Sequence, residues 1–452
     1  MIPYRVAVVG SGPAGVYAAE ALVRSRIDVS VDIYDRLPTP YGLVRYGVAP
    51  DHPRIKSIIV ALQKVLERPQ VRFLGDVHVG VDVTTDELGE LYDAVVFATG
   101  ASVGRRLSIP GEDLAGVCSA TDFVAWYSGH PDHAQAAESF PLAAESVVVI
   151  GAGNVALDVA RLLAKSAEDL TQTDMPPHVL DRLADSSVRD VHLVCRRGPE
   201  HAKFTAKELR ELLELDHVAT KLDAGLLPAG SEDPMTAANL KAFADLAARE
   251  VVDGQRTLHF HFWSRPVEFL EAGGAVAAVR LEKMQEVDGA VVPTGEVTEL
   301  KAGMVVRSVG YHSTPVGTLP FDEDLGRVPH DAGRVLGPDG RALNGHYVAG
   351  WVKRGPSGVV GTNRACAADT VVSILADLEG RPPRGVAPDE VDRVLAERGV
   401  RPVTYDGWLS IDSEELSRGQ VLGRARTKIP DWATLRRVGV PGVRRTSPRS
   451  SH

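Results

Sequence analysis

The feature that most constrains this 452-residue chain is the segment RVAVVGSGPAG at residues 5–15. Its short apolar run, residues 6–9, is too brief for a helix and is typical of a parallel strand buried on both faces. Gly10, Gly12 and Gly15 follow in the spacing G-x-G-x-x-G, which permits a tight turn, close approach of a pyrophosphate, and close packing of the next helix. The helix N-terminus would face the phosphates with free N–H groups and its positive dipole end. This segment therefore predicts a dinucleotide-binding strand, turn and helix.

An acidic residue at the end of the next predicted strand supports this interpretation. Ser30 to Asp35 reads SVDIYD, so Asp35 lies twenty positions after Gly15. A carboxylate at this place can accept a hydrogen bond from a ribose 2′-hydroxyl. The alternative is an ordinary strand-to-helix turn, which has no need of that acid.

A second copy of the pattern begins at residue 146. The strand covers residues 147–150, the fingerprint positions hold Gly151, Gly153 and Ala156, and a helix follows. Single matches of this kind arise by chance, but two in one chain rarely do. We therefore predict two nucleotide-binding domains of the α/β class.

The strand that follows the second copy ends differently from the first. Residues 191–195 are followed by Arg196 and Arg197 and by no acid. A guanidinium pair fits a 2′-phosphate as an acid fits a 2′-hydroxyl, so this site is expected to prefer NADP over NAD. The alternative is a solvated basic pair beyond a strand.

Length, charge and hydropathy limit the class of protein. A chain of 452 residues exceeds one ordinary core and predicts two or three domains. The formal net charge of −10 argues against nucleic acid or an anionic membrane as the main partner. No run of about twenty apolar residues occurs, which predicts no membrane span. The first strand begins close to Met1 and leaves no room for a signal peptide, so we expect a cytoplasmic protein.

The three cysteines, Cys118, Cys195 and Cys366, lie far apart and form no C-x-x-C pair. This spacing predicts no disulfide framework, no thioredoxin-type dithiol and no metal site.

The rest of the chain alternates predicted elements with loops. An amphipathic helix is expected at 54–67, strands at 71–74, 77–81 and 92–100, and an antiparallel meander at 258–263, 267–270 and 275–281. A loop rich in proline and glycine, residues 36–53, is long enough to suggest a function. A second glycine-rich loop, residues 346–361, leads into a predicted helix and suggests another phosphate or ring-edge contact.

Several segments, in order along nearly the whole chain, resemble the ferredoxin-NADP reductases of the adrenodoxin-reductase type. They are VVGSGPAG, PTPYGLVRYGVAPDHP, YDAVVFATG, IGAGNVALDVAR, RRGP with FTAKELRE, VVRSVGY and GWVKRGPSGVVGTN. The second and the last are highly specific, since ordinary dinucleotide enzymes lack them. The resemblance implies an α/β fold with two three-layer (ββα) nucleotide-binding domains of the glutathione-reductase-like type. The FAD domain would be discontinuous, with residues 1–104 and 309–452 including a C-terminal extension, and the NADP domain would be residues 105–308.

The resemblance also implies which residues contact FAD and NADP. The residues expected at FAD are Gly10, Gly12, Pro13, Ala14, Gly15, Asp35, Leu43, Val77, Trp351, Gly358, Val359 and Val360. The residues expected at NADP are Ala152, Gly153, Asn154, Val155, Arg196, Arg197 and Glu208, and Arg105 is a further cofactor contact. Trp351 and residues 358–360 would line the flavin ring and the nicotinamide, where a helix N-terminus stabilises negative charge on the reduced ring.

The implied activity is hydride transfer from NADPH to FAD, followed by transfer of single electrons to a small iron–sulfur ferredoxin. The cofactors supply the chemistry, and the protein supplies stacking geometry and electrostatics. His52 and Glu211 match family positions at the flavin and nicotinamide, and Asp158 is a third catalytic candidate; they would position the rings and relay a proton. The alternatives are a loop histidine that caps a turn and, for Glu211, a solvated helix acid. We expect a monomer.

Other activities stay open at this point. An NADPH-quinone reductase of the diaphorase type would use the same reduced flavin. A flavin monooxygenase would need a substrate cavity and controlled oxygen access, which nothing in the sequence demands. A non-catalytic nucleotide sensor is disfavoured by Trp351 and the loop glycines. The absence of a C-x-x-C pair excludes the disulfide reductases.

Charge at the expected ferredoxin surface departs from the family pattern. In the family a basic surface of the NADPH domain receives the acidic ferredoxin, but residues 237–250 contain only Lys241 and Arg249, offset by Asp245 and Glu250. Other candidates for this surface are Lys203, Lys207 and Arg210. Complementary charge would mainly raise the association rate.

Overall fold

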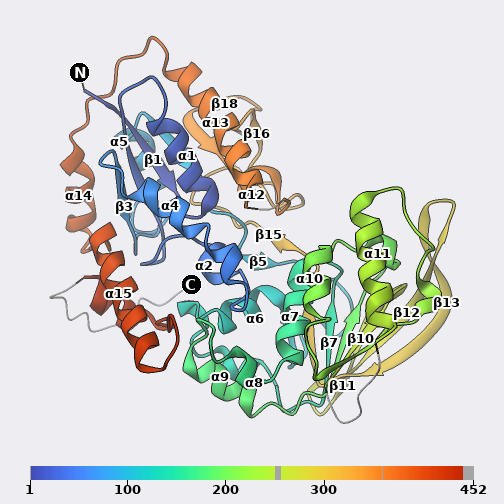
Figure 1. Ribbon diagram of the computed structural model, residues 1–452. Coiled ribbons are helices and arrows are strands. Elements are labelled where there is room, and N and C mark those ends of the chain that lie inside the picture. Colours follow the sequence, from blue (N-terminus) through green and yellow to red (C-terminus); the bar gives the residue numbers. More distant parts are fainter. Residues whose placement is uncertain (1, 250–255, 359, 441–452) are drawn as a thin grey trace. The chain divides into compact units, whose positions relative to one another are not determined.

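The computed structural model describes residues 2–249, 256–358 and 360–440. The chain forms two compact units (Figure 1). The first contains Met1–Val48, His52–Val103 and Tyr311–His452, and the second contains Ala49–Asp51 and Gly104–Gly310. The expected domain boundaries at 104/105 and 308/309 lie close to these divisions, and the cofactor that each unit binds stays a prediction.

The first unit is built around a seven-stranded sheet. Its strands are β1 (Tyr4–Val9), β2 (Val29–Tyr34), β3 (Val71–Leu74), β4 (Ala94–Phe97), β16 (His330–Asp331), β17 (Arg334–Leu336) and β18 (Ala342–Val348). Their order is β16-β17-β18-β4-β1-β2-β3. The pairs from β18 to β3 are parallel, whereas β17 is antiparallel to both of its neighbours.

Strand β1 lies inside this sheet and is buried on both faces. Its alternate residues enter two apolar clusters, Val6 and Val8 in one and Ala7 and Val9 in the other. This double burial explains why the strand reads as one continuous apolar run. Helices that contribute to the first cluster include α1 (Pro13–Val23), α4 (Ile59–Leu66) and α13 (Thr362–Leu378). The turn that follows β1 is therefore held by a rigid strand.

The C-terminal part of the chain completes the core of the first unit. Trp408, Ile411 and Leu435 are buried in the same cluster as Val6 and Val8. The remaining helices of this unit are α2 (Leu43–Tyr46), α3 (Pro53–Lys56), α5 (Thr85–Leu91), α12 (Trp351–Arg354), α14 (Pro388–Glu397), α15 (Tyr405–Val421) and α16 (Trp432–Gly439).

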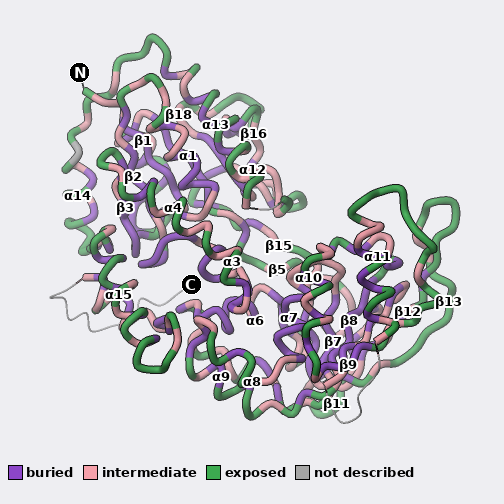
Figure 2. The backbone as a smooth tube through the Cα atoms, in the orientation of Figure 1, coloured by how far each residue is buried: buried purple, intermediate pink, exposed green. Residues whose placement is uncertain are grey.

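The second unit contains a six-stranded parallel sheet. Its strands are β6 (Val117–Ser119), β7 (Ser146–Ile150), β8 (Asp190–Val194), β9 (Val218–Lys221), β10 (Arg256–His261) and β14 (Met304–Arg307), in the order β6-β14-β7-β8-β10-β9. A three-stranded antiparallel meander, β11 (Ser264–Ala272), β12 (Ala275–Val287) and β13 (Ala290–Lys301), packs on one face. Figure 2 shows the central strands in purple as buried, whereas much of β13 is green and exposed.

Helices cover the opposite face of this sheet. Val147 and Leu193 pack there with residues of α6 and α7. The helices of the second unit are α6 (Ala120–Tyr127), α7 (Asn154–Ala164), α8 (Ala167–Leu170), α9 (Pro177–Ala184), α10 (Ala206–Glu211) and α11 (Pro234–Ala247), with 3-10 turns at Pro131–His133, Ala136–Ser139, Pro199–His201 and Ala224–Leu226. Two short strands, β5 (Val103–Gly104) and β15 (Tyr311–His312), lie in the connecting segments.

The structure corrects three predicted elements. The strand expected as the first of the meander is β10, which pairs in parallel with β8 and β9, because alternating polarity cannot distinguish such a strand from a hairpin strand. Residues 77–81 form a turn, since Gly80 has φ +95° and the Asp82 carboxylate accepts the N–H of His78 at 2.9 Å. The helix expected at 54–67 is divided into α3 and α4.

Within the described ranges, no helix combines the length and apolarity needed to cross a bilayer.

Candidate nucleotide-binding sites

The glycine-rich turn after β1 has the geometry that its spacing predicts. Gly10 has φ +109°, and a Cβ there would lie 2.4 Å from the Ala98 carbonyl oxygen. A Cβ at Gly15 would lie 1.9 Å from the Gly10 oxygen, so only glycine lets α1 pack this closely. A Cβ at Gly12 would meet no protein atom within 4 Å. The turn therefore leaves room beside Gly12 for another molecule.

The first turn of α1 also suits an anion. Its N-cap is Gly12, which has no side chain to cap the helix, and Pro13 occupies the first helical position. Other helices of the chain carry a side-chain cap at this place, as Thr84 does for α5 and Ser119 for α6. Backbone N–H groups that no side chain caps, together with the helix dipole, favour a phosphate.

Asp35 follows β2 and faces the same turn. Its carboxylate accepts hydrogen bonds from the backbone N–H groups of Ser11 and Leu37, each at 2.9 Å, and from the Ser11 hydroxyl. Burial, partly offset by these hydrogen bonds, raises the pKa of Asp35. The side chain is thus fixed beside the turn, and its oxygens retain further lone pairs for a hydroxyl donor.

Both glycine-rich loops noted in the sequence reach this turn. The N–H of Tyr41 donates to the Ser11 carbonyl at 3.1 Å. A Cβ at Gly350 would lie 2.5 Å from the Cβ of Ala14. Residues far apart in sequence therefore converge on the start of α1.

The other positions expected at FAD lie around these loops. Leu43 begins α2 and is half-buried, and Val77 is buried, with its N–H donating to the Asp35 carbonyl at 3.0 Å. Trp351 begins α12, donates from its ring nitrogen to the Ser357 carbonyl at 3.2 Å, and packs at 5.4 Å between ring centroids against Tyr311.

The loop before α13 is only partly described. Gly358 is exposed with φ +82°, Val360 is half-buried against the core of the unit, and Val359 lies outside the described residues.

The second unit repeats the first turn in detail. Gly151 has φ +152°, and a Cβ there would lie 2.3 Å from the Ser308 carbonyl oxygen. A Cβ at Gly153 would meet no protein atom within 4 Å, and Ala156 is fully buried under the helix start. Gly153 is the N-cap of α7 and offers no capping side chain. This second turn also leaves room for a phosphate at a helix N-terminus.

Side chains and backbone groups tie the start of α7 to the segment before α10. Ala152 accepts the N–H of Lys203 through its carbonyl at 2.8 Å, and the side-chain oxygen of Asn154 accepts the N–H of Thr205 at 2.9 Å. Val155 is half-buried against the core. The polar atoms of this turn are therefore held before any ligand arrives.

The other positions expected at NADP differ in exposure. Arg196 and Arg197 follow β8 and are both exposed, which leaves their guanidinium groups accessible to a phosphate. Glu208 is 7% exposed and accepts a hydrogen bond from the Thr205 hydroxyl. Arg105 is exposed, and its N–H donates to the Gly310 carbonyl at 2.9 Å.

The structure brings Asp158 and Glu211 together through a buried arginine. Arg161 is 1% exposed and donates to Asp158 at 2.8 Å; its Nη1 lies 3.7 Å from a carboxylate oxygen of Glu211. Glu211 also lies 4.0 Å from the ammonium of Lys207. Neither acid is thus simply solvated.

Asp51 is the residue of this cluster that sequence reasoning missed. Its carboxylate accepts from Arg161 at 2.8 and 3.0 Å and from Lys165 at 2.7 Å. Burial alone would raise the pKa of Asp51, but hydrogen bonds and charge from Arg161 and Lys165 lower it overall. The spacing of Asp158 and Arg161, three residues apart on one helix, was the available signal for part of this network.

His52 belongs to the first unit, whereas Asp158 and Glu211 belong to the second. His52 is 6% exposed and occupies the N-cap position of α3, but its side chain makes no capping hydrogen bond. The side chain therefore does not cap α3, and the role of His52 at the flavin stays a prediction.

Known proteins resemble this chain over most of its length. The family model of pyridine nucleotide-disulphide oxidoreductases matches residues 4–196. NADPH-ferredoxin reductase FprA of Mycobacterium tuberculosis is 42% identical over 97% of this chain and 100% of its own length. The mitochondrial NADPH:adrenodoxin oxidoreductases of Arabidopsis thaliana and Homo sapiens are 40% and 41% identical over 96% of this chain, and over 95% and 91% of their own lengths.

A solved structure gives the same result in three dimensions. Mycobacterium tuberculosis FprA in complex with NADPH superimposes with a TM-score of 0.92 at 41% identity, covering 97% of this chain and 100% of that chain. Sequence and fold thus match over nearly the full length of both proteins. The chain belongs to the family of NADPH-ferredoxin reductases and NADPH:adrenodoxin oxidoreductases.

Proposed function

We propose that this protein is a ferredoxin-NADP reductase, which uses FAD to pass electrons from NADPH to a ferredoxin. The observation that carries the proposal is the pair of glycine turns, each with open space beside its second glycine and each followed by a different ribose-side partner. Asp35 stands against the first turn, and Arg196 and Arg197 follow the strand beside the second. FAD at the first turn would offer a ribose 2′-hydroxyl to Asp35, and NADPH at the second would offer its 2′-phosphate to Arg196 and Arg197.

Binding and orienting FAD and NADPH is the task that falls to the side chains of both turns and their neighbours. Bound FAD supplies the step from a two-electron hydride donor to a one-electron acceptor. The turns at Gly12 and Gly153 would hold the pyrophosphates, and Arg196 and Arg197 would bind the 2′-phosphate. Trp351, Gly358 and Val360 would line the rings. His52, Asp158 and Glu211 would position the reacting rings and hold a proton near them.

The cysteines argue against dithiol chemistry in the proposed reaction. Cys118, Cys195 and Cys366 are all free, and the first two are buried. Burial raises the pKa of both Cys118 and Cys195 well above the ordinary thiol value, so neither is a ready thiolate. Although the matching family model is named for disulphide oxidoreductases, Cys118 and Cys195 do not form a reactive dithiol.

The test separates a ferredoxin reductase from a quinone reductase and from an inert sensor. The purified protein is mixed anaerobically with NADPH, and flavin absorbance is followed. We expect rapid bleaching, then faster reoxidation by a [2Fe–2S] or [4Fe–4S] ferredoxin than by a quinone at equal concentration. A flavin that stays oxidised, or one that only quinones reoxidise, would refute the proposal.

The partner surface is proposed from exposed bases of the second unit. Lys203, Lys207 and Arg210 are exposed, whereas Arg249 donates to the carbonyl groups of Leu212 and Leu215 at 3.0 and 2.6 Å and is mostly buried. The first three would steer an acidic ferredoxin, with an association rate that falls as the salt concentration rises.

A monomer in the cytoplasm fits this role. Sedimentation would check the oligomeric state, and cell fractionation would check the location.

Replacing His52 with Gln tests its proposed role. We expect the rate of flavin reduction by NADPH to fall, because the imidazole that positions the ring or holds the proton is gone. His312→Gln, a half-buried histidine of the same unit, serves as the control. An unaltered rate in the first variant, measured by stopped flow, would remove His52 from the mechanism.

A further inference from the structure

A cluster of imidazoles occupies one part of the second unit that the proposed reaction does not use. His192 on β8 and His259 on β10 are directly opposite in the register of these parallel strands. Their rings stack with centroids 4.4 Å apart and an interplanar angle of 22°. His261, two residues along β10, forms a 2.9 Å hydrogen bond with Nδ1 of His192 through its Nε2. Asp190 begins β8, on the same face as His192 because side chains alternate along a strand.

The position of this cluster on the sheet explains why it is polar. The opposite face of the same strands holds Leu193, Leu258 and other apolar residues of the helix-covered core. On the cluster's own face, the meander packs over Val148 and Val194. The imidazoles therefore line the part of the face nearest β9, beside an open hollow of about 400 Å³ bordered by His259, His261, Lys221 and Arg249 among others.

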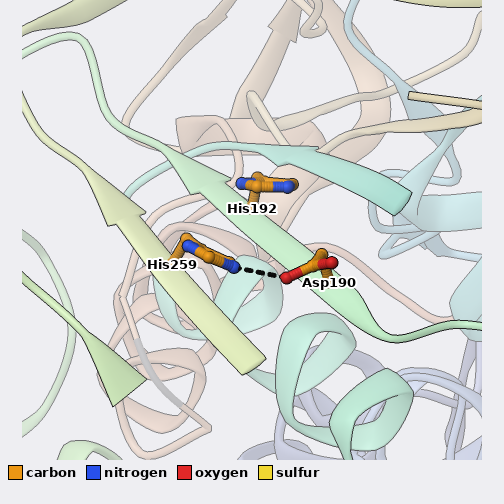
Figure 3. Close-up of side chains that lie close together, drawn as sticks. All are labelled: Asp190, His192 and His259. Atoms are coloured by element: carbon orange, nitrogen blue, oxygen red, sulfur yellow. Dashed lines mark hydrogen bonds and ion pairs between the residues drawn. The ribbon is translucent and has the colours of Figure 1, made fainter. Parts of the chain in front are cut away.

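The donor atoms of three of these side chains converge. One ligand atom each from Asp190, His192 and His259 lies within 4.8 Å of the other two. Figure 3 shows that the three side chains extend from two neighbouring strands, with a dashed line between Asp190 and His259. The Asp190 carboxylate lies 2.6 Å from Nε2 of His259. Two imidazoles and one carboxylate form a donor set that suits zinc and related divalent transition metals, with a remaining position for water.

A hydrogen bond to a neighbouring imidazole orients His192 for metal binding. When Nδ1 of His192 donates to His261, the tautomer leaves the lone pair on Nε2, and the ring orientation is fixed. Lys221, opposite His259 on β9, carries a positive charge that opposes a cation.

We propose that Asp190, His192 and His259 form a binding site for a divalent transition metal such as Zn²⁺, with His261 as an orienting partner. The site joins β8 to β10 and lies apart from the glycine turn at the carboxyl end of β7. The sequence predicted no metal site, since these ligands lie on two strands about seventy residues apart and form no recognised motif.

The test uses tag-free holoprotein treated with a chelator and then titrated with Co²⁺, whose bound form absorbs at longer wavelength than flavin, and with Zn²⁺ in competition. We expect one equivalent of Zn²⁺ to displace Co²⁺. His192→Gln and His259→Gln should each lower affinity by about tenfold or more, and Asp190→Asn should also weaken binding. Lys221→Met should strengthen binding, because it removes the opposing charge.

A second group of potential ligands in the described residues provides a matched control. Glu200, His201 and Glu286 also lie within ligand distance of one another, on a more exposed surface. His201→Gln should leave Co²⁺ binding unchanged. Binding that survives in the His192 and His259 variants but is lost in His201→Gln would overturn the proposal, as would the absence of stoichiometric binding to the wild-type protein.

Flavin content and the unfolding temperature distinguish loss of the site from loss of the fold. Each variant should retain bound flavin, and Zn²⁺ should raise the unfolding temperature of the wild type but not of Asp190→Asn. Asp190 is only partly buried, so its amide variant should fold even where a histidine variant does not. If this variant binds Zn²⁺ as the wild type does, the carboxylate is not a ligand and the proposed site is wrong.

Discussion

The two kinds of glycine in the first turn should respond differently to the same small change. Gly12→Ala adds a methyl group that meets no protein atom, so the free energy of unfolding of the apoprotein should stay nearly constant while FAD binding weakens. Gly15→Ala places its methyl group 1.9 Å from the Gly10 oxygen and should destabilise the fold itself. Flavin content and urea unfolding measured on both variants check this. Equal loss of stability in the two would contradict it.

The arginine pair after β8 should determine nucleotide preference. With Arg196 and Arg197 both replaced by Ala, KM for NADPH should rise by about ten- to a hundredfold, because hydrogen bonds to charged groups contribute about 1.5–3 kcal/mol. The KM for NADH should hardly change, since NADH lacks the 2′-phosphate. Arg182→Ala, an exposed arginine on α9, is the control. A parallel rise of both KM values would argue for a general effect on the fold.

At the level of elements, a buried ion pair connects α15 to α2. Glu415 is fully buried and interacts with Arg45, which is 4% exposed; it also accepts from Arg426 at 3.0 Å and from the N–H of Ile429 at 2.9 Å. Glu415→Ala would leave the Arg45 charge buried without its partner, at a cost of about 3–5 kcal/mol. Because Arg45 lies in α2, which begins at Leu43, flavin should also be released more easily. Urea unfolding and flavin retention provide the measurements.

The neighbouring acid provides the control for this element. Glu414 pairs with Arg418 on the exposed side of α15, so Glu414→Ala should cost less than about 0.5 kcal/mol. The pH dependence gives a further check. Burial would raise the pKa of Glu415, but Arg45 and Arg426 lower it below the ordinary 4.5. The stabilisation is therefore present above pH 4.5 and lost as pH falls through the folded value, a dependence that Glu415→Ala should weaken.

Elements with strong local signals could be predicted from the sequence, and those set by distant partners could not. The predicted strand at 71–74 is confirmed as β3, because neighbouring residues in the sequence indicate where the strand begins and ends. By contrast, β10 was assigned to the meander, since its pairing with β8 and β9 is decided by segments far away in sequence. The same limit applies to the sites. The glycine turns are local motifs, whereas Asp51 joins Arg161 across 110 positions and could not be found by spacing.

At the scale of the whole molecule, the second unit should fold without the first. Residues 104–310 contain a complete parallel sheet with its own apolar clusters on both faces. An excised fragment of these residues should therefore unfold cooperatively and bind NADP⁺ but no FAD. Far-UV circular dichroism and binding to an NADP⁺ analogue check this. A fragment that remains unfolded would show that the unit depends on the rest of the chain.

The fragment should nevertheless lack one contribution, because Asp51 belongs to the second unit but lies outside residues 104–310. In the full chain, Arg161→Met removes one of the two cationic partners of Asp51 as well as the partner of Asp158, and the cost should be about 3–5 kcal/mol. In the fragment, where Asp51 is already absent, the same substitution should cost less than half as much. Hydrogen exchange of α7, followed by mass spectrometry, gives the free energy of opening in all four proteins. Equal costs in the full chain and the fragment would mean that Asp51 contributes nothing to holding Arg161 in place.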